Sequence, residues 1–184
     1  IDTGHISLLL PPDATVACGE PIEPSTTGRA SASDPDAVDE APTVTYIDQP
    51  DLSGCGRTGT ILRTWSATDE CGNAVSGIQT LTIVDATPPT LVVPGDVIVE
   101  CGSSTLPAST GLAMASDACS TVSVTHEDRW ISGECGSTGT ILRTWSASDA
   151  CGNASTGVQT IAVVDTTAPA LVVPPTATVE CGHS

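Results

Sequence analysis

Apolar and polar residues alternate in short runs along the whole chain, and Gly, Pro, Ser and Thr interrupt these runs. Alternation with a period of two is typical of strands that bury one face, and such strands between turn residues indicate a sandwich or barrel. The pattern therefore predicts an all-β fold. The expected strands lie at residues 6–10, 15–18, 43–47, 59–68, 77–84, 91–93, 97–101, 111–116, 122–129, 139–148 and 157–164.

These strands belong to two copies of one module. The ten residues at 58–67, TGTILRTWSA, return unchanged at 138–147, and D-x-C-G-N follows in both copies. A third opening, LVVPPTATVECG at 171–182, repeats LVVPGDVIVECG at 91–102. Self-similarity at a fixed period of about 80 residues is the signature of a tandem array of small modules.

The repeat divides the chain into four parts. We expect an N-terminal tail at residues 1–5, module one at 6–87, module two at 88–167, and the opening strand of a third module at 168–184. This last strand is either truncated or donated to a neighbouring subunit. Strand addition of that kind is head-to-tail, does not close, and therefore builds a filament.

The apolar core of each module is small. The chain has no Phe, one Tyr and three Trp among 184 residues, and a domain of this size buries only about 60% of its unfolded surface. Eight Cys at repeating positions, without a C-x-x-C pair, predict disulfides formed in an oxidising compartment. We therefore expect an extracellular or cell-surface protein whose marginal modules are stapled by disulfides.

The charge balance excludes several functions. Asp and Glu number 22 against five Arg, and the formal net charge is −17. Nucleic acid and anionic lipid both require cationic contacts, so neither is an expected partner. No apolar run approaches the ~20 residues of a membrane span. No catalytic frame or phosphate-binding loop is recognisable, so we expect no enzyme and no required cofactor.

Several spaced motifs carry a family resemblance. RTWSA(T/S)D-x-C-G-N, a Q-T strand ending in V-D, then T-x-P and V-E-C-G resemble hyalin-type (HYR) repeats. They are most similar to the Cys-containing variant repeated in large bacterial surface adhesins. The resemblance covers nearly the whole chain and implies tandem immunoglobulin-like β-sandwich modules. It also implies an adhesive or structural role, with copies of the chain or further modules as head-to-tail partners.

Two functions are compatible with this resemblance. The first is a structural subunit or segment of an extracellular fibril or surface adhesin. The second is a glycan- or surface-binding module that uses loop residues. Trp130 is the candidate binding residue, because it lies outside the repeated strand.

The implied immunoglobulin-like topology suggests disulfides within modules. The second strand of a module would end where strand 59–68 or 139–148 begins, and strand 111–116 would end beside the turn that follows residue 148. We favour three pairs: Cys18 with Cys55, Cys101 with Cys135, and Cys119 with Cys151.

Two cysteines remain unmatched in this scheme. Cys71 lacks a counterpart because Asp36 stands roughly where module two has Cys119, and the module of Cys181 is incomplete. A second scheme stays open, in which disulfides join successive modules and all eight cysteines are used. Its pairs are Cys71 with Cys101, Cys151 with Cys181, Cys18 with Cys55, and Cys119 with Cys135.

Each repeated strand also carries an Arg that is a candidate for a buried charged residue. Arg63 and Arg143 precede Trp by two positions and therefore share its face of the strand. We expect cross-strand ion pairs with Asp48 and Asp128. The alternative is an exposed Arg stacked on Trp.

The joint between modules carries two further candidates. Asp85, Asp117 and Asp149 should converge there as candidate calcium ligands, since calcium binds several oxygen atoms. Asp also favours turns, which explains the same residues without a metal. Asn153-Ala154-Ser155 is an N-glycosylation sequon.

Overall fold

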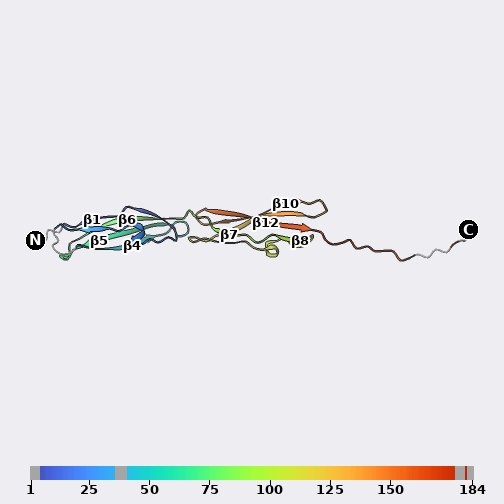
Figure 1. The fold of residues 1–184 in the computed structure, drawn as a ribbon, viewed down its shortest axis with the longest axis horizontal. Helices are drawn as coiled ribbons and strands as arrows, with labels where there is room; N and C mark the ends of the chain where they lie inside the picture. Colours follow the sequence, from blue (N-terminus) through green and yellow to red (C-terminus); the bar gives the residue numbers. More distant parts are fainter. Residues whose placement is uncertain (1–4, 36–40, 177–180, 182–184) are drawn as a thin grey trace.

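The computed structural model describes residues 5–35, 41–176 and 181. Two β modules lie end to end along one axis, followed by an extended segment after β12 (Figure 1). The predicted all-β class is confirmed. Most of the predicted N-terminal tail, Asp36 and most of residues 177–184 lie outside the described residues.

Module one consists of a two-stranded and a four-stranded sheet. In the smaller sheet, β1 (Ser7–Leu9) pairs antiparallel with β3 (Ser31–Ser33). The larger sheet has the order β2-β6-β5-β4, in which only the β2–β6 pair is parallel. Its strands are β2 (Ala14–Ala17), β6 (Ala74–Val84), β5 (Gly59–Thr68) and β4 (Thr43–Asp51).

Module two repeats this arrangement. Its smaller sheet pairs β7 (Thr90–Val92) with β9 (Met114–Ser116). Its larger sheet has the order β8-β12-β11-β10, again with one parallel pair, β8 with β12. The strands are β8 (Val97–Glu100), β12 (Ala154–Val164), β11 (Gly139–Ser148) and β10 (Ser123–Ser132).

A single helical turn follows the second strand of each module, which the sequence analysis did not predict. The turns are α1 (Pro24–Thr27) and α2 (Pro107–Thr110). Pro at the first helical positions is pre-organised for a helix, and glycine ends each turn at positive φ. Gly28 has φ +97, and a Cβ there would lie 2.7 Å from Pro11. Glycine is therefore required on both counts.

The two central strands of each large sheet together supply most of the core. In β5 the alternation buries Ile61, Arg63, Trp65 and Ala67, and β11 buries the equivalent residues. Among the described residues, the buried members of the apolar cluster around Ile61 are Val16, Leu81 and Ile83. So small a cluster leaves the modules dependent on other interactions.

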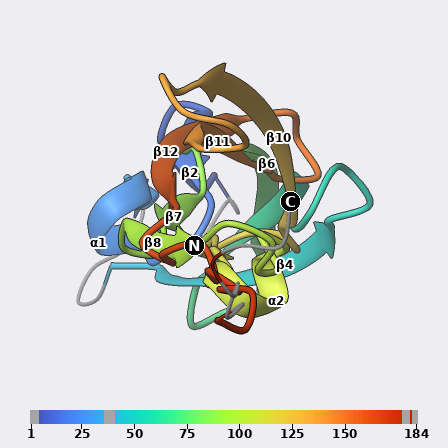
Figure 2. The same ribbon diagram turned by 90° about the vertical axis from the view of Figure 1, so that its right-hand side faces the viewer.

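The two modules are rotated about the long axis relative to each other. Viewed along that axis, α1 and α2 lie at different positions around it (Figure 2). The tandem repeat is therefore helical rather than purely translational, and successive modules present their sheets in different directions.

Candidate functional site

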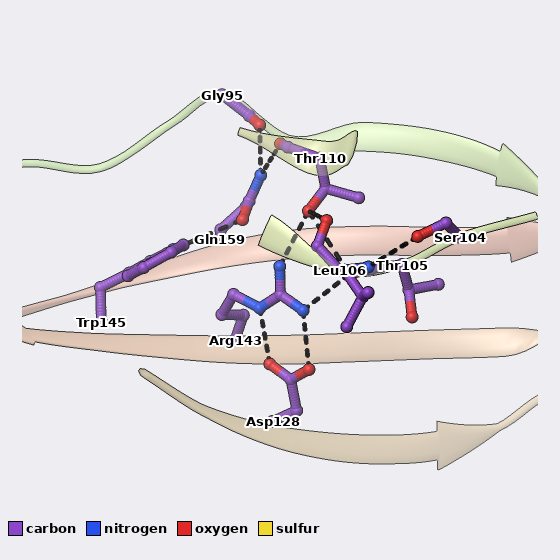
Figure 3. A network of polar contacts seen from close by, with 9 residues as sticks. All are labelled: Gly95, Ser104, Thr105, Leu106, Thr110, Asp128, Arg143, Trp145 and Gln159. Atoms are coloured by element: carbon purple, nitrogen blue, oxygen red, sulfur yellow. Dashed lines mark hydrogen bonds and ion pairs between the residues drawn. The ribbon is translucent and has the colours of Figure 1, made fainter. Parts of the chain in front are cut away.

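Arg143 is the centre of a polar network in the core of module two (Figure 3). Its Nε and Nη2 atoms each donate a hydrogen bond of 2.7 Å to one carboxylate oxygen of Asp128. Nη1 donates to the Thr110 hydroxyl at 2.8 Å, and Nη2 also donates to the Thr105 carbonyl at 2.7 Å. The Arg143 side chain is only 1% exposed. These bonds compensate the desolvation of a buried charge, which is otherwise strongly unfavourable.

Module one contains the same network. Arg63 donates to both carboxylate oxygens of Asp48 at 2.7 and 2.8 Å, to the Thr27 hydroxyl at 2.8 Å, and to the Ile22 carbonyl at 2.8 Å. The hydrogen bond to Asp48 raises the pKa of Arg63 above its ordinary value. The structure thus brings together the Asp and Arg of each predicted pair.

Stacking accompanies these ion pairs instead of replacing them. The guanidinium carbon of Arg63 lies 4.6 Å from the centre of the Tyr46 ring and 5.9 Å from that of Trp65. In module two the corresponding distance from Arg143 to the Trp145 ring is 5.8 Å. The Arg is buried between its carboxylate and an aromatic face, so the prediction of an exposed stacked Arg is wrong.

A buried glutamine completes each polar core. Gln159 Nε2 donates to the carbonyls of Gly95 and Thr110 at 3.0 and 2.7 Å, and its Oε1 accepts from Trp145 Nε1 at 3.4 Å. Gln79 does the same in module one, where it is fully buried. These bonds tie the first segment of each module to its central strands.

Sequence reasoning missed four of these residues: Thr27, Thr110, Gln79 and Gln159. A signal existed, because P-x-x-T-G occurs at both 24–28 and 107–111, and Q-T occurs at both 79–80 and 159–160. A spacing that recurs within a repeat marks positions whose side chains share a structural role.

The junction between the modules is closed by two disulfides. Cys18 is bonded to Cys119 with a Cα–Cα distance of 5.8 Å, and Cys55 is bonded to Cys151 with a distance of 5.0 Å. Each bond joins module one to module two. The predicted pairs of Cys18 with Cys55, Cys101 with Cys135, and Cys119 with Cys151 are therefore wrong, as are the partners in the second scheme.

The reason is that the module ends touch. The topology does place Cys18 and Cys55 at one end of module one, as expected, but module two abuts that end. Gly56 has φ +62, and a Cβ there would lie 2.6 Å from Ser120 Cβ and 2.9 Å from the Cys119 carbonyl. Each sulfur consequently meets a partner across the junction. Disulfides do join successive modules, as the second scheme expected, but through other pairs.

Two cysteines of the predicted pairs are not bonded. Cys101 and Cys135 carry free thiols, and so does Cys181. Cys101 is partly buried and Cys135 is exposed. Cys71, which the first scheme left outside its pairs, is also exposed.

Hydrogen bonds reinforce the disulfides at the junction. Asn153 Nδ2 donates to Asp149 Oδ2 at 2.8 Å and to the Asp85 carbonyl, in the linker, at 3.3 Å. Ser155 Oγ donates to the Pro89 carbonyl at 2.7 Å. The linker is therefore held against module two. Asn153 thus uses both hydrogens of its amide nitrogen for structure, and a glycan there would replace one of these bonds; glycosylation of Asn153 stays a prediction.

Asp149 organises the turn between β11 and β12. Burial works to raise its pKa, but hydrogen bonds from Asn153, Cys151 and Gly152 outweigh burial and hold the pKa below its ordinary value. Asp149 Oδ1 accepts from the Cys151 and Asn153 amides at 2.9 and 2.8 Å. Its carboxylate thus positions Cys151 for the bond to Cys55.

The candidate calcium ligands come together only in part. Asp85, Asp117 and the Cys119 sulfur have ligand atoms within 4.8 Å of one another. Asp85 Oδ2 is buried without a hydrogen-bond partner among the described residues. The Cys119 sulfur is in a disulfide, however, and Asp149 is occupied by its turn. Calcium takes six to eight oxygen ligands, so the carboxylates of Asp85 and Asp117 do not make a site by themselves, and calcium at the joint stays a prediction.

Trp130 lies near the end of β10 and is 48% exposed. Its ring covers Gly139, where a Cβ would lie 2.7 Å from the ring. Trp130 is thus partly available for contact, and a binding role for this residue stays a prediction.

The chain is extracellular. Disulfides such as the two at the junction form and persist in oxidising surroundings and are rare in the cytosol. Among the described residues, none of the helices has the length and apolar character needed to cross a bilayer.

No family model matches the chain, and no curated protein matches it. Solved cadherin structures are similar at a low level. Protocadherin gammaB7 EC3-6 is 11% identical over 88% of this chain, with a TM-score of 0.34, and this chain spans only 50% of its length. Human mucin-like protocadherin EC1-2 is 12% identical over 89% of this chain and 100% of its own, with a TM-score of 0.36.

A third similar structure is Drosophila N-cadherin EC1-4. It is 15% identical over 86% of this chain and 49% of its own, with a TM-score of 0.32. At this level the likeness carries no argument about partners, ions or function. The chain is an extracellular array of β-sandwich modules, and its distinguishing feature is the disulfide-bonded junction between them.

Proposed function

We propose that the chain is a structural segment of an extracellular fibril or surface adhesin, in which β-sandwich modules are locked at fixed orientation. The observation that carries this proposal is the doubly disulfide-bonded junction. Cys18–Cys119 and Cys55–Cys151 connect residues 101 and 96 positions apart. A scaffold needs such long-range closure, because a polypeptide linker alone would leave the modules free to bend.

The number of attachments matters for rigidity. A linker is one attachment, which permits bending and twisting. One added disulfide still permits rotation about the line that joins the linker and the disulfide. Here the linker and two separate disulfides make three attachments, which together restrict every rotation. On the chain-entropy model, closing a loop of about 100 residues contributes roughly 4–5 kcal/mol. Because the two loops overlap, the second closure contributes less than the first.

The acidic surface suits this role. A net charge of −17 on 184 residues keeps neighbouring segments apart and favours solubility. The buried Arg networks give each module a fixed core without a large apolar one. Both features favour a rod that holds other parts of a larger assembly at a distance.

Small-angle X-ray scattering of the 184-residue chain tests the proposal. We expect the oxidised protein to scatter as a rigid rod, and reduction to broaden its distance distribution as the junction opens. The double variant Cys55→Ser/Cys151→Ser is the control, because it removes one of the two disulfides and should give an intermediate curve. Identical scattering before and after reduction would contradict the proposal.

The segment after module two supports a role in extending the array. Leu171, Val172 and Val173 are 86%, 87% and 72% exposed. Their burial requires either a further module of the same polypeptide or the sheet edge of a neighbouring copy, as in strand addition. Sedimentation velocity separates these cases. A monomer supports the first, whereas linear oligomers that disappear on truncation after Thr167 support the second.

A further inference from the structure

The free end of module two has the same local structure as the bonded end of module one. The Cys18 amide donates to the Val84 carbonyl at 2.8 Å, and the Cys101 amide donates to the Val164 carbonyl at 2.7 Å. Each cysteine therefore continues the parallel strand pair of its module in the same way. Cys101 is the counterpart of Cys18 in position and in backbone geometry.

The second cysteine of each end is also held alike. The Cys55 carbonyl accepts from the Thr58 amide at 3.1 Å and from the Thr58 hydroxyl at 2.8 Å. The Cys135 carbonyl accepts from the Thr138 amide at 3.0 Å and from the Thr138 hydroxyl at 2.6 Å. Cys135 is thus presented on the same turn as Cys55.

The glycine after each cysteine shows what differs between the two ends. Gly19 and Gly56 have φ of +91 and +62, while Gly102 and Gly136 have +85 and +53, so the backbone conformation is shared. A Cβ on Gly56 would collide with module two. On Gly102 or Gly136 it would meet no atom within 4 Å among the described residues. Module two therefore presents the same end, uncovered.

We propose that Cys101 and Cys135 form one side of a second disulfide-bonded junction, and that the other side is a further module of this type. The occupant carries cysteines at the positions of Cys119 and Cys151 and bonds them to Cys101 and Cys135 respectively. This inference rests on the proposed scaffold function and specifies how the scaffold continues. The supporting observation is that the equivalent sulfurs of module one are bonded in that way in the same structure.

The chain itself identifies the occupant. Residues 171–182 repeat residues 91–102, so the segment that leaves module two opens another module with Cys181 in the place of Cys101. Glu100 directs this segment, because its carboxylate accepts hydrogen bonds from the Thr166 amide at 2.7 Å and from the Thr167 hydroxyl at 3.0 Å. The linker therefore leaves module two beside Cys101.

A second copy of the chain fits this end less well. It would present module one, in which the sequence has Asp36 roughly at the position of Cys119. Of the two cysteines that the junction requires, only the one at the position of Cys151 has a counterpart in module one. The pattern of cysteines therefore favours a further module over a second copy.

Forming the two disulfides of this second junction requires an oxidant. Each bond joins two thiols and releases two protons and two electrons. The acceptor is a disulfide such as oxidised glutathione, which is reduced to two thiols for every bond formed. A cysteine thiolate first attacks one sulfur of oxidised glutathione, which forms a mixed disulfide and releases one glutathione thiolate. The second cysteine thiolate then attacks the cysteine sulfur of the mixed disulfide and releases the other glutathione thiolate.

The test extends the full chain to three modules. Residues 1–184 are followed by a copy of residues 105–167, which completes the third module with the sequence of module two. The protein is folded with reduced and oxidised glutathione, and disulfides are mapped by mass spectrometry of unreduced peptides. We expect Cys101 bonded to the added copy of Cys119, and Cys135 to the added copy of Cys151. Alkylation of Cys101 and Cys135 should fall from complete in the 184-residue chain to none.

Three results would overturn the inference: a bond between Cys101 and Cys135, a bond between the added copies of Cys119 and Cys151, or thiols that stay alkylatable at Cys101 and Cys135. The variant Cys101→Ser/Cys135→Ser is the folding control, and it should keep both bonds of the first junction. Those bonds also separate the two proposals. If they form and the second pair does not, only this inference fails; if they do not form, the scaffold proposal fails with it.

Discussion

Arg143 donates two parallel hydrogen bonds of 2.7 Å to Asp128 from inside the sandwich, with a side chain that is 1% exposed beside one that is 37% exposed. The pair connects the buried centre of the module to its edge strand. The four polar bonds of Arg143 take the place of apolar packing in a chain that contains no Phe. A charged residue is thus a core residue here.

Replacement of Arg143 by Met should therefore destabilise module two. Met fills part of the volume but leaves the Thr110 hydroxyl and the Thr105 carbonyl without their donor, and it leaves Asp128 without its counter-charge. Breaking a buried pair by removing one partner costs roughly 3–5 kcal/mol. We expect about 3 kcal/mol, because Asp128 can regain water. Chemical denaturation followed by Trp fluorescence measures the loss.

Arg129→Met is the matched control for this prediction. Arg129 lies on the same strand as Asp128 and is exposed. Its replacement should change the free energy of unfolding by no more than about 0.5 kcal/mol. Equal losses in Arg143→Met and Arg129→Met would show that the buried network does not contribute.

The same pair predicts an acid dependence. The hydrogen bond from Arg143 holds the pKa of Asp128 below its ordinary value. A carboxylate with a lowered pKa in the folded state contributes stability above its unfolded pKa of about 3.9, and that contribution is lost as the pH falls through the folded value. As the pH is lowered below about 4, the melting temperature should therefore decrease, in part because Asp128 becomes protonated.

Asp128→Asn isolates this contribution. The variant should melt lower than the wild type at neutral pH and lose less on further acidification. Glu127→Gln, at an exposed neighbouring position, removes one carboxylate without touching Arg143 and should follow the wild-type profile. If the Asp128→Asn profile is as steep in acid as that of wild type, the linkage is refuted.

The long central strands show how far sequence reasoning reaches. β5 and β11 begin and end where the alternation predicted, because ten residues of strict period two are unambiguous. The Asp48–Arg63 pair followed from the same period, since it fixes which side chains share a face. The turns α1 and α2 escaped prediction because four residues cannot show a helical period.

The disulfides illustrate what a repeat conceals. The positions of Cys18 and Cys55 at one end of a module could be derived from the topology of that module. Their partners depend on how close the next module lies, and that distance is set by the packing of Gly56 against Ser120 across the junction. A sequence considered one module at a time contains no information on such a contact.

Gly56 and Gly136 form a matched pair that tests the junction. Both have positive φ, so Gly→Ala should strain either turn by about 1 kcal/mol. Gly56→Ala must also push Ser120 and Cys119 away, whereas Gly136→Ala meets open space. We expect Gly56→Ala alone to make the Cys55–Cys151 bond reducible at lower dithiothreitol concentration. Equal sensitivity in both variants would mean that the module ends are not in tight contact.

Calcium removal should leave the junction unchanged. Asp117 Oδ1 already accepts from the Cys119 and Ser120 amides at 2.8 and 3.0 Å, and Asp149 is committed to its turn. Only Asp85 Oδ2, among the side chains of the described residues, is buried without a partner, and it supplies a single ligand of the six to eight that calcium takes. We expect the same melting temperature with calcium and with chelator.

Asp85→Asn makes this prediction decisive. The substitution removes a buried charge and keeps the Oδ1 position that accepts from the Thr87 amide at 3.2 Å. It should leave the melting temperature unchanged or raise it slightly, because no counter-ion is lost. A calcium ion at the joint would give the opposite result. Chelator would then lower the melting temperature of the wild type, Asp85→Asn would lower it further in calcium, and the variant would no longer respond to chelator.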